Sequence, residues 1–470
     1  MSNQIRTVSP STGEVIFEHP GTSLEQARKI AYSAKAALQP LKDISLADRK
    51  AIVLKALEII TANVELLAKE LTLQMGRPIA YTAGEIDTMC LRARYLVSIA
   101  DKSLQVIPGD MEREKEIRKF VKKEPVGPVL ISAAWNYPYL ITINALVPAL
   151  LAGNSVILRP SPQTPLVGER LVSYFHEAGL PPNALQIIHC GSFDLLGEII
   201  NIPEIALVCY IGSTKGGICL REASARRILP LNLELGGNDP AYVREDAELV
   251  YTAKQIVDGA VFNSGQSCCA IERVYVHESV HDAFVKEVQR ELASYKLGDP
   301  MDKSTTTGPV ISHQAVAIIQ SHITDALAAG AVDVTPQNRA FDTSALPSKG
   351  SFLAPVVLTG VTNKMLVMRE ETFGPVIPIM KVSSDEEAVE LMNESEYGLT
   401  ASVWTRDIAR GEELGEQIDA GTVFVNRCDY PSPDLAWIGW KNSGLGCSLG
   451  PQAFDAFYRL KSFHLREAQV

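Results

Sequence analysis

The chain has 470 residues, of which 46% are hydrophobic and 21% charged, and its formal net charge is −11. This composition is typical of a soluble globular protein, and the length favours two or three domains. The negative charge argues against nucleic acid and against an anionic membrane surface as partners. The N-terminal residues lack the apolar core of a signal peptide. The apolar stretch 138–153 is too short to span a bilayer, and Asn144 and Pro148 interrupt it.

The eight cysteines are spread along the chain and include no CxxC pair. This spacing argues against a zinc cluster, and we predict no metal site. Scattered cysteines in a long chain without a signal peptide are typical of reduced thiols, so we expect a cytoplasmic protein.

Residues 23–100 are predicted to be helical, because apolar residues recur at helical spacing through the segment 47–60. Short apolar runs typical of buried strands follow at 126–134, 155–158, 185–189 and 205–211. Helix-compatible stretches such as 166–179 lie between them. Strands that alternate with helices predict an α/β fold with a parallel, doubly wound sheet. Dinucleotides bind at the carboxyl ends of the strands in such sheets.

A second alternating block follows Gly237. It contains a predicted strand at 273–277, a helix at 281–295 and a strand at 421–426, which together indicate a second α/β domain. The segments 117–123 and 457–465 mix large apolar and polar residues. Both are typical of exposed strands, which can pair with another subunit.

Cys268 is the candidate nucleophile, within the segment Asn-Ser-Gly-Gln-Ser-Cys-Cys at 263–269. Most cysteines are buried and inert, because few have the depressed pKa that reactivity needs. The preceding Gly-Gln pair, and an offset of 34 residues from Glu234, favour a catalytic role. Cys269 is the alternative. Adjacent residues point in different directions, so only one of the two thiols should face a cleft.

Glu234 is the candidate general base. In the segment 231–237, leucines should occupy one face of a strand, and Asn232 and Glu234 the other. The alternative is a glutamate that faces solvent. The Gly-Gly pair that follows allows the backbone to approach a ligand closely. An apolar wall would raise the pKa of the carboxyl toward neutrality, as a general base requires. A thiol and a base together predict a thioester that forms and is hydrolysed, as in aldehyde oxidation.

Two further segments follow predicted strands. The glycine-rich segment 212–217 begins a helix, where backbone N–H groups can bind phosphate oxygens. Glycine is favoured in any strand-to-helix turn, so the glycines alone do not indicate phosphate binding. The prediction of a phosphate site depends on the apolar strand that precedes them. Asn136, in Trp135-Asn136-Tyr137-Pro138, follows the first apolar run, and its amide could donate to a developing oxyanion. An ordinary turn is the alternative for that segment.

In this order, the four segments resemble those of the NAD(P)-dependent aldehyde dehydrogenase superfamily, and the chain is similar to its succinate-semialdehyde dehydrogenase-like branch. The resemblance runs from the segment 9–14 to the C-terminal strand. It includes Met-Gly-Arg-Pro-Ile at 75–79, Glu-Glu-Thr-Phe-Gly-Pro at 370–375 and Tyr-Gly-Leu at 397–399. The spacing between Glu234 and Cys268 is also that of the family.

The resemblance implies a role for each candidate. Cys268 would attack the aldehyde carbonyl, and Asn136 with the Cys268 N–H would hold the oxyanion. Hydride would pass to NAD or NADP, and Glu234 would activate the water that hydrolyses the thioester. The residues implied to bind the cofactor are Trp135, Arg159, Ser161, Gly212, Ser213, Glu371 and Phe373.

The family fold is a Rossmann-type cofactor domain, a catalytic domain and a β-hairpin for oligomerisation. It implies a cofactor-binding domain at 1–110 and 126–236, and a catalytic domain at 237–440. The oligomerisation strands would lie at 111–125 and 455–470, in a homodimer or homotetramer.

The chain departs from the family pattern near the cofactor and near the substrate. The family usually has lysine where Arg159 stands, and NAD-specific members often have glutamate where Pro162 stands. Arginine offers a planar fork suited to phosphate, and without a glutamate at position 162 no carboxylate would repel the 2′-phosphate of NADP. We therefore expect the enzyme to accept NADP. The segments 436–441 and 446–448 also differ from the family, which predicts an unusual substrate mouth.

The resemblance places the substrate tunnel between the segment after Asn136 and the loop after Asn426. Its implied walls are Tyr139, Ile141, Tyr430 and Trp437. Arg427 is the one cation in these two stretches, and it could bind the carboxylate of a semialdehyde. Alternatively, Arg427 faces solvent or pairs with a nearby aspartate.

Two other functions remain as alternatives. A CoA-acylating relative would pass the thioester to coenzyme A, and Glu234 argues against it because that branch commonly lacks the base. The second alternative is a non-catalytic protein that retains the fold. The presence of Cys268 and Glu234 argues against it, because such a protein has no chemical need for a paired nucleophile and base.

Overall fold

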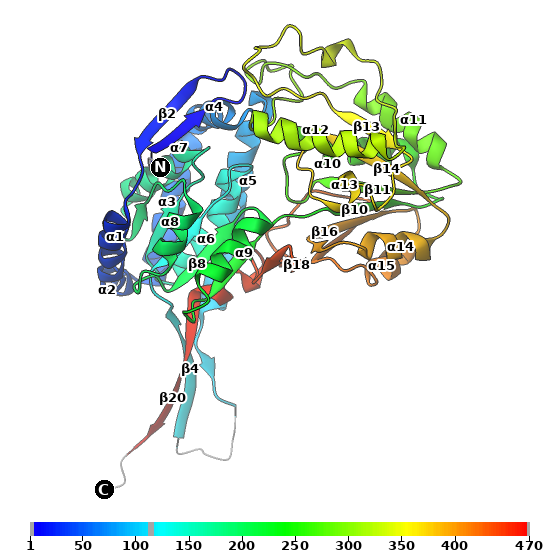
Figure 1. Cartoon of the computed structure of the whole chain (residues 1–470). Coiled ribbons are helices and arrows are strands. Elements are labelled where there is room, and N and C mark those ends of the chain that lie inside the picture. The colour runs from blue at the N-terminus through cyan, green and yellow to red at the C-terminus, as the bar shows by residue number, and fades with distance from the viewer. Residues whose placement is uncertain (1–3, 111–116, 468–470) are drawn as a thin grey trace.

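The computed structural model describes residues 4–110 and 117–467. Figure 1 shows two lobes side by side, with a ribbon of strands projecting from the first lobe. Each lobe contains a mostly parallel sheet, so the predicted α/β class is confirmed. In the described part of the chain, no helix combines the length and apolar character needed to cross a membrane.

The sheet of the first lobe has six strands in the order β19-β9-β8-β5-β6-β7. Neighbours from β9 to β7 run parallel, and β19 joins the edge in the antiparallel sense. The strands are β5 (Val129–Ser132), β6 (Val156–Arg159), β7 (Leu185–Ile187), β8 (Leu207–Ile211), β9 (Leu231–Glu234) and β19 (Gly444–Leu445). The four apolar runs expected before the glycine-rich turn are therefore confirmed as strands of one sheet.

Helices cover both faces of this sheet, as a doubly wound fold requires. Along β5, Val129 and Ile131 pack with helices α3 to α7, whereas Leu130 packs with α1, α8 and α9. The helical segment expected at 23–100 is confirmed as α1 to α5. The helices are α1 (Leu24–Ala36), α2 (Leu38–Asp43), α3 (Leu46–Ala62), α4 (Val64–Met75), α5 (Ile79–Leu104), α6 (Pro138–Leu151), α7 (Pro165–Glu177), α8 (Phe193–Ile200) and α9 (Thr214–Ala223).

The sheet of the second lobe has seven strands in the order β12-β13-β14-β11-β10-β16-β17. Only the short β12 at one edge is antiparallel to its neighbour. On β10, Tyr242 packs into one core, and Ala241 and Val243 pack into another, so both faces are again buried. The strands are β10 (Asp239–Val243), β11 (Ile271–His277), β12 (Val332–Asp333), β13 (Val356–Thr359), β14 (Val376–Val382), β16 (Thr400–Trp404) and β17 (Thr422–Val425).

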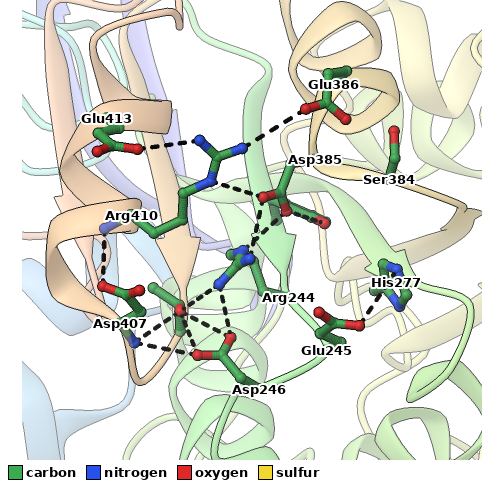
Figure 2. A network of polar contacts seen from close by, with 12 residues as sticks. Arg244, Glu245, Asp246, His277, Ser384, Asp385, Glu386, Asp407, Arg410 and Glu413 are labelled. Atoms are coloured by element: carbon green, nitrogen blue, oxygen red, sulfur yellow. Dashed lines mark hydrogen bonds and ion pairs between the residues drawn. The ribbon is translucent and has the colours of Figure 1, made fainter.

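A polar network ties the helices of the second lobe to the end of β10 (Figure 2). Asp385 accepts hydrogen bonds from Arg244 Nε at 2.9 Å, from Arg410 Nε at 3.0 Å and from the Tyr242 hydroxyl at 2.8 Å. It thereby joins β10 to α14 and α15. The helices of this lobe are α10 (Leu249–Val261), α11 (His281–Leu292), α12 (His313–Ala328), α13 (Leu366–Arg369), α14 (Asp385–Asn393) and α15 (Ile408–Gly415).

The projecting ribbon has three strands in the order β20-β4-β3. The strands are β3 (Ile107–Pro108), β4 (Ile117–Pro125) and β20 (Tyr458–Arg466). The two segments expected to be exposed strands thus pair with each other along their whole length. Phe120 and Phe463 stack across them with ring centroids 4.8 Å apart. Of the expected oligomerisation strands, residues 111–116 and 468–470 lie outside the described residues.

Short elements complete the fold. They are the antiparallel pair β1 (Gln4–Val8) and β2 (Val15–Pro20), the pair β15 (Tyr397–Gly398) and β18 (Trp440–Lys441), and 3-10 turns at Phe262–Gly265, Arg339–Phe341 and Pro451–Phe457. The last of these turns buries Ala453, Phe454 and Phe457 in the helical core of the first lobe. The chain therefore returns from the second lobe to the first before it enters the ribbon.

Candidate active site

A cavity of about 550 Å³ lies where the two lobes meet. Residues that follow β5, β8 and β9 line it from the first lobe, and these are adjacent parallel strands. This is the expected ligand position in a doubly wound sheet. The second lobe contributes the loop that carries Cys268. The lining residues singled out from sequence are Trp135, Asn136, Ile141, Gly212, Ser213, Glu234, Cys268, Glu371, Phe373, Tyr430 and Trp437.

A left-handed turn positions the Cys268 loop. Asn263, Ser264 and Gly265 have φ angles of 54°, 59° and 72°, so the chain reverses sharply after α10. A Cβ on Gly265 would lie 2.2 Å from the Gly374 carbonyl oxygen, so the close approach requires glycine. Gln266 then fixes the loop, because its side-chain oxygen accepts from the Ile311 N–H at 2.7 Å.

The two neighbouring cysteines have different environments. Cys268 is half-buried, whereas Cys269 is 4% exposed. The Cys269 thiol donates to Asp429 Oδ1 at 2.9 Å. A hydrogen bond with Cys268, burial and the charge of Asp429 all raise the pKa of Cys269 well above its usual range. The Cys269 thiol is therefore held protonated against a carboxylate, and Cys268 is the better placed of the two for attack.

Asn136 lies against the nucleophile loop. Its Nδ2 contacts the Gln266 carbonyl at 3.4 Å, and its own carbonyl accepts from Asn263 Nδ2 at 3.3 Å. An amide nitrogen carries two hydrogens, so one long contact leaves donor capacity for a ligand oxygen. The structure thus brings Asn136 and the cysteine loop together at one end of the cavity.

A buried ion pair that we did not single out from the sequence supports this arrangement. Arg77 donates to the Glu85 carboxylate, to the Asn136 carbonyl and, from Nε, to Asn263 Oδ1 at 3.1 Å. The side chains of Arg77 and Glu85 are each 1% exposed. Glu85 Oε1 also accepts from the Tyr139 N–H at 2.9 Å, at the start of α6. Arg77 belongs to the segment 75–79, which entered the sequence analysis only through the family resemblance.

Glu234 ends β9 with its carboxyl group in the cavity. Leu233 and Leu235 pack into the core on the opposite face, so the expected alternation is confirmed. The Ser448 hydroxyl donates to Glu234 Oε1. Burial raises the pKa of Glu234, and the Ser448 hydrogen bond and the charge of Arg92 partly oppose that rise. A carboxyl group in this setting suits a base that acts near neutral pH.

The two glycines after Glu234 allow a close approach to the second lobe. A Cβ on Gly236 would lie 2.3 Å from Glu371 Oε2, and a Cβ on Gly237 would lie 2.2 Å from the Cys268 carbonyl oxygen. The Gly237 N–H donates to Glu371 Oε1 at 3.1 Å. Burial raises the pKa of Glu371 to about 7.

Phe373 adopts a constrained backbone beside Glu371. Its φ angle is 50°, in the left-handed region. The buried Glu272 carboxylate accepts the N–H groups of Thr372 at 2.7 Å and of Phe373 at 2.8 Å, which holds this turn. The Phe373 ring meets the Trp135 ring edge-on, with centroids 5.6 Å apart. These two rings form an aromatic wall between the lobes.

The glycine-rich turn begins α9, as predicted. Ser213 is the N-cap, and its hydroxyl accepts from the Gly216 N–H at 3.2 Å. A Cβ on Gly216 would lie 2.0 Å from the Tyr210 hydroxyl oxygen, so glycine is required there. The free N–H groups and the dipole of a helix N-terminus favour a phosphate at this position. The site therefore fits a dinucleotide, with Gly212 and Ser213 on the cavity wall.

Two expected cofactor residues lie away from the cavity wall. Arg159 is 7% exposed, and its Nε and Nη2 donate to the Cys190 carbonyl at 2.9 and 2.6 Å. The Ser161 hydroxyl accepts from the Gln163 N–H at 3.2 Å. Contact of Arg159 or Ser161 with the cofactor stays a prediction.

Helical geometry decides which residues after Asn136 face the cavity. Tyr137, Leu140, Ile141 and Asn144 line it, at the i, i+3, i+4, i+7 spacing of one helix face. Tyr139, expected on the tunnel wall, is instead 1% exposed and packs in the helical core.

The expected cation also lies elsewhere. Arg427 is exposed, and its guanidinium stacks on the Tyr430 ring at 3.8 Å from the centroid, outside the residues that line the cavity. The structure does not bring Arg427 to the cavity, whereas Tyr430 and Trp437 do line it. Sequence reasoning missed Thr88 and Arg92, which reach the cavity from α5. Among the described residues, no group of three or more His, Cys, Asp or Glu side chains could hold a metal ion.

The cavity between the two α/β lobes is lined by a thiol, a buried carboxyl group and a helix N-terminus. This combination is typical of dinucleotide-dependent dehydrogenases. The chain belongs to the aldehyde dehydrogenase family, whose sequence model matches residues 1–463. It is therefore an NAD(P)-dependent oxidoreductase that converts an aldehyde to a carboxylic acid.

Relatives cover nearly the whole chain. A 3,6-anhydro-alpha-L-galactose dehydrogenase of Streptomyces coelicolor is 32% identical over 98% of this chain and 93% of its own length. A glutarate-semialdehyde dehydrogenase of Pseudomonas putida is 31% identical over 97% of this chain and 93% of its own. Betaine aldehyde dehydrogenase from Staphylococcus aureus in complex with NAD+ superposes with a TM-score of 0.92 and 28% identity, covering 100% of this chain and 93% of its own. An NADP-dependent enzyme of E. coli superposes with a TM-score of 0.94 and 27% identity, covering 99% and 95%.

Proposed function

We propose that Cys268 is the nucleophile that attacks the aldehyde carbonyl carbon. A carbon–sulfur bond forms, and negative charge develops on the carbonyl oxygen. The Asn136 amide and the Cys268 N–H stabilise that charge by donating hydrogen bonds. The location of Cys268, Asn136 and Glu234 around one cavity is the single observation that carries the proposal.

Residues on the other side of the cavity would hold the cofactor. NAD+ or NADP+, when bound, accepts the hydride that leaves the tetrahedral carbon. Glu371 would bind the nicotinamide ribose, with Trp135 and Phe373 as the aromatic wall beside it. Gly212 and Ser213 would face the pyrophosphate at the start of α9. The absence of an acid at position 162 supports the use of NADP as well as NAD, and contact of Arg159 and Ser161 with the cofactor is part of the same proposal.

Glu234 would complete the cycle by taking a proton from water. The hydroxide attacks the thioester carbon, the carbon–sulfur bond breaks, and the thiolate of Cys268 is restored. One aldehyde, one oxidised cofactor and one water give one acid, one reduced cofactor and one proton. The raised pKa of Glu234 supports its role as a base, and its presence favours hydrolysis over transfer to coenzyme A.

The walls of the substrate end support a semialdehyde or another aliphatic or aromatic aldehyde. Ile141, Tyr430 and Trp437 provide an apolar channel. The related glutarate-semialdehyde dehydrogenase favours the semialdehyde branch for this chain.

We further propose a cofactor-binding domain at 1–110 and 126–236, a catalytic domain at 237–440 and oligomerisation strands at 111–125 and 455–470. A homodimer or homotetramer would assemble through the ribbon. In the described residues, β20 is an edge strand, and Leu460 and Leu465 on it are 63% and 45% exposed. An exposed edge with apolar side chains favours pairing with a second copy. The eight free thiols support a cytoplasmic location.

The experiment that tests this function is a rate assay at the absorbance of the reduced cofactor. Purified enzyme is given NAD or NADP with aliphatic, aromatic and semialdehyde substrates, with and without coenzyme A. Formation of acid with stoichiometric NAD(P)H, independent of coenzyme A, supports the proposal. A strict requirement for coenzyme A would establish the acylating alternative instead.

A further inference from the structure

Arg92 is a buried cation inside the substrate end of the cavity. It lies on α5, is 5% exposed, and lines the cavity together with Thr88 one helical turn earlier. The neighbouring walls are apolar, from Leu140 and Trp437. A guanidinium in such a place keeps its charge, because arginine is not deprotonated in proteins.

The partners of Arg92 leave part of its guanidinium unused. Nη2 donates to the Pro431 carbonyl at 3.3 Å, and Nε is buried without a partner. When the Asn144 amide nitrogen donates to the Leu140 carbonyl at 3.0 Å, its oxygen accepts from Arg92 Nη1 at 3.3 Å. These acceptors are neutral. No carboxylate forms an ion pair with Arg92 within residues 4–110 and 117–467.

The carboxylates near this end of the cavity are already engaged. Glu234 accepts from Ser448, and Asp429 accepts from Cys269 at 2.9 Å and from Ser267 at 3.2 Å. These donors are neutral and leave the carboxylate charges in place, but neither carboxylate lies within ion-pair distance of Arg92, the one cation among the described residues that line the cavity. A buried charge without a counterion is costly, and a bound anion removes that cost. A cationic group placed beside Arg92 would be repelled by the like charge of its guanidinium.

We propose that Arg92 determines specificity by binding an anionic group, a carboxylate, at the end of the substrate remote from the aldehyde. This inference rests on the proposed function and narrows its substrate class to ω-semialdehydes. Each Nη carries two hydrogens and has one neutral acceptor, so the planar guanidinium can donate one further hydrogen bond from each Nη to the two oxygens of a carboxylate. The apolar walls at Leu140, Ile141 and Trp437 would contact the methylene chain between the two ends. Arg92 thus takes the role first considered for Arg427.

The test compares anionic and neutral aldehydes of matched chain length. The kcat/KM values are measured for succinic semialdehyde against butanal, and for glutaric semialdehyde against pentanal. The enzymes are wild type, Arg92→Met, Arg92→Lys, Arg427→Met and the control Arg94→Met, which removes an exposed arginine from the same helix. Because Arg92 also lowers the pKa of Glu234, the ratio of semialdehyde to neutral aldehyde is compared, so that any effect on the shared base cancels.

We expect wild type to prefer the semialdehydes and Arg92→Met to lose about a hundredfold in that ratio, as for a buried charge pair that loses one partner. The loss should fall mainly on KM, Arg92→Lys should restore part of it, and Arg94→Met should leave the ratio unchanged. If Arg92→Met does not fold, two other measurements test the role of Arg92. Wild type should prefer the semialdehydes, and Arg92→Lys should raise the KM for semialdehydes alone.

Three results would overturn the inference. They are a wild type with no preference for semialdehydes, an equal effect of the Arg92 variants on neutral and anionic aldehydes, and a selective loss in Arg427→Met instead. A wild type that oxidises butanal and pentanal without a preference removes the role of Arg92 and leaves the proposed function intact. A wild type that reduces no cofactor with any of these aldehydes contradicts the proposed function itself.

Discussion

Replacing Ser448 by alanine should make the enzyme require a higher pH. The Ser448 hydroxyl donates to Glu234 Oε1 and stabilises the carboxylate form, so it lowers the pKa of Glu234 against the effect of burial. Without that donor the pKa of Glu234 rises further. The base acts only when it is deprotonated, so activity at low pH is lost first.

The size of the effect follows from the bond that is removed. A hydrogen bond to a charged group contributes about 1.5 kcal/mol at the low end of its range, and 1.36 kcal/mol corresponds to one pH unit. The acid limb of the kcat profile should therefore move up by about one pH unit in Ser448→Ala. At a pH well above that limb, kcat should stay within about threefold of wild type, since Glu234 is then fully ionised.

The assay is steady-state kcat measured from about pH 5 to 9, with the single-turnover rate of NAD(P)H formation recorded in parallel. Ser443→Ala is the matched control. It removes another buried hydroxyl of the same segment, one that accepts from the Gly398 N–H at 3.0 Å and does not contact Glu234. The reasoning is refuted if the acid limb does not move in Ser448→Ala, or if it moves equally in the control.

Three further variants test other parts of the site. Cys268→Ala should reduce turnover by at least about a thousandfold, whereas Cys269→Ala should retain most of it; the opposite pattern would reassign the nucleophile. Gly236→Ala places a Cβ 2.3 Å from Glu371 Oε2 and should displace that carboxylate, which raises the KM for the cofactor about tenfold with little change in Tm. An unaltered cofactor KM would argue against a Glu371 contact with the ribose. Arg77→Met leaves its carboxylate partner buried and uncompensated, so urea unfolding should show a loss of about 3–5 kcal/mol, and a loss below about 1 kcal/mol would contradict the buried ion pair.

The candidates at strand ends could be predicted from sequence because their signals are local. Asn136 follows an apolar run, and Glu234 ends one with a Gly-Gly pair after it. In a parallel sheet the carboxyl ends of neighbouring strands lie side by side, so recognising the runs as strands was enough to bring these residues together. The preceding Gly-Gln pair and the offset from Glu234 favoured Cys268 over Cys269 in the sequence, and the contact between Cys269 and Asp429 in the structure supports that choice.

The substrate end could be predicted only in part, because its walls depend on the rotation of helices. Tyr139 and Ile141 were expected together, but residues two apart point to different sides of a helix. The i, i+3, i+4 pattern from Tyr137 would have selected Leu140 and Ile141 instead. Arg92 had no local signal, since it reaches the cavity only because α5 packs against α6 and the Pro431 loop.

The central claim is that Cys268 carries an acyl group that Glu234 hydrolyses. Its most direct test is stopped-flow mixing of Glu234→Gln with aldehyde and NAD(P)+, followed by mass spectrometry of the quenched protein. We predict a burst of NAD(P)H equal to the concentration of active sites, a much slower steady state, and the acyl mass on the peptide that contains Cys268. Turnover at the wild-type rate without a burst, or an acyl group on a different residue, would contradict the account.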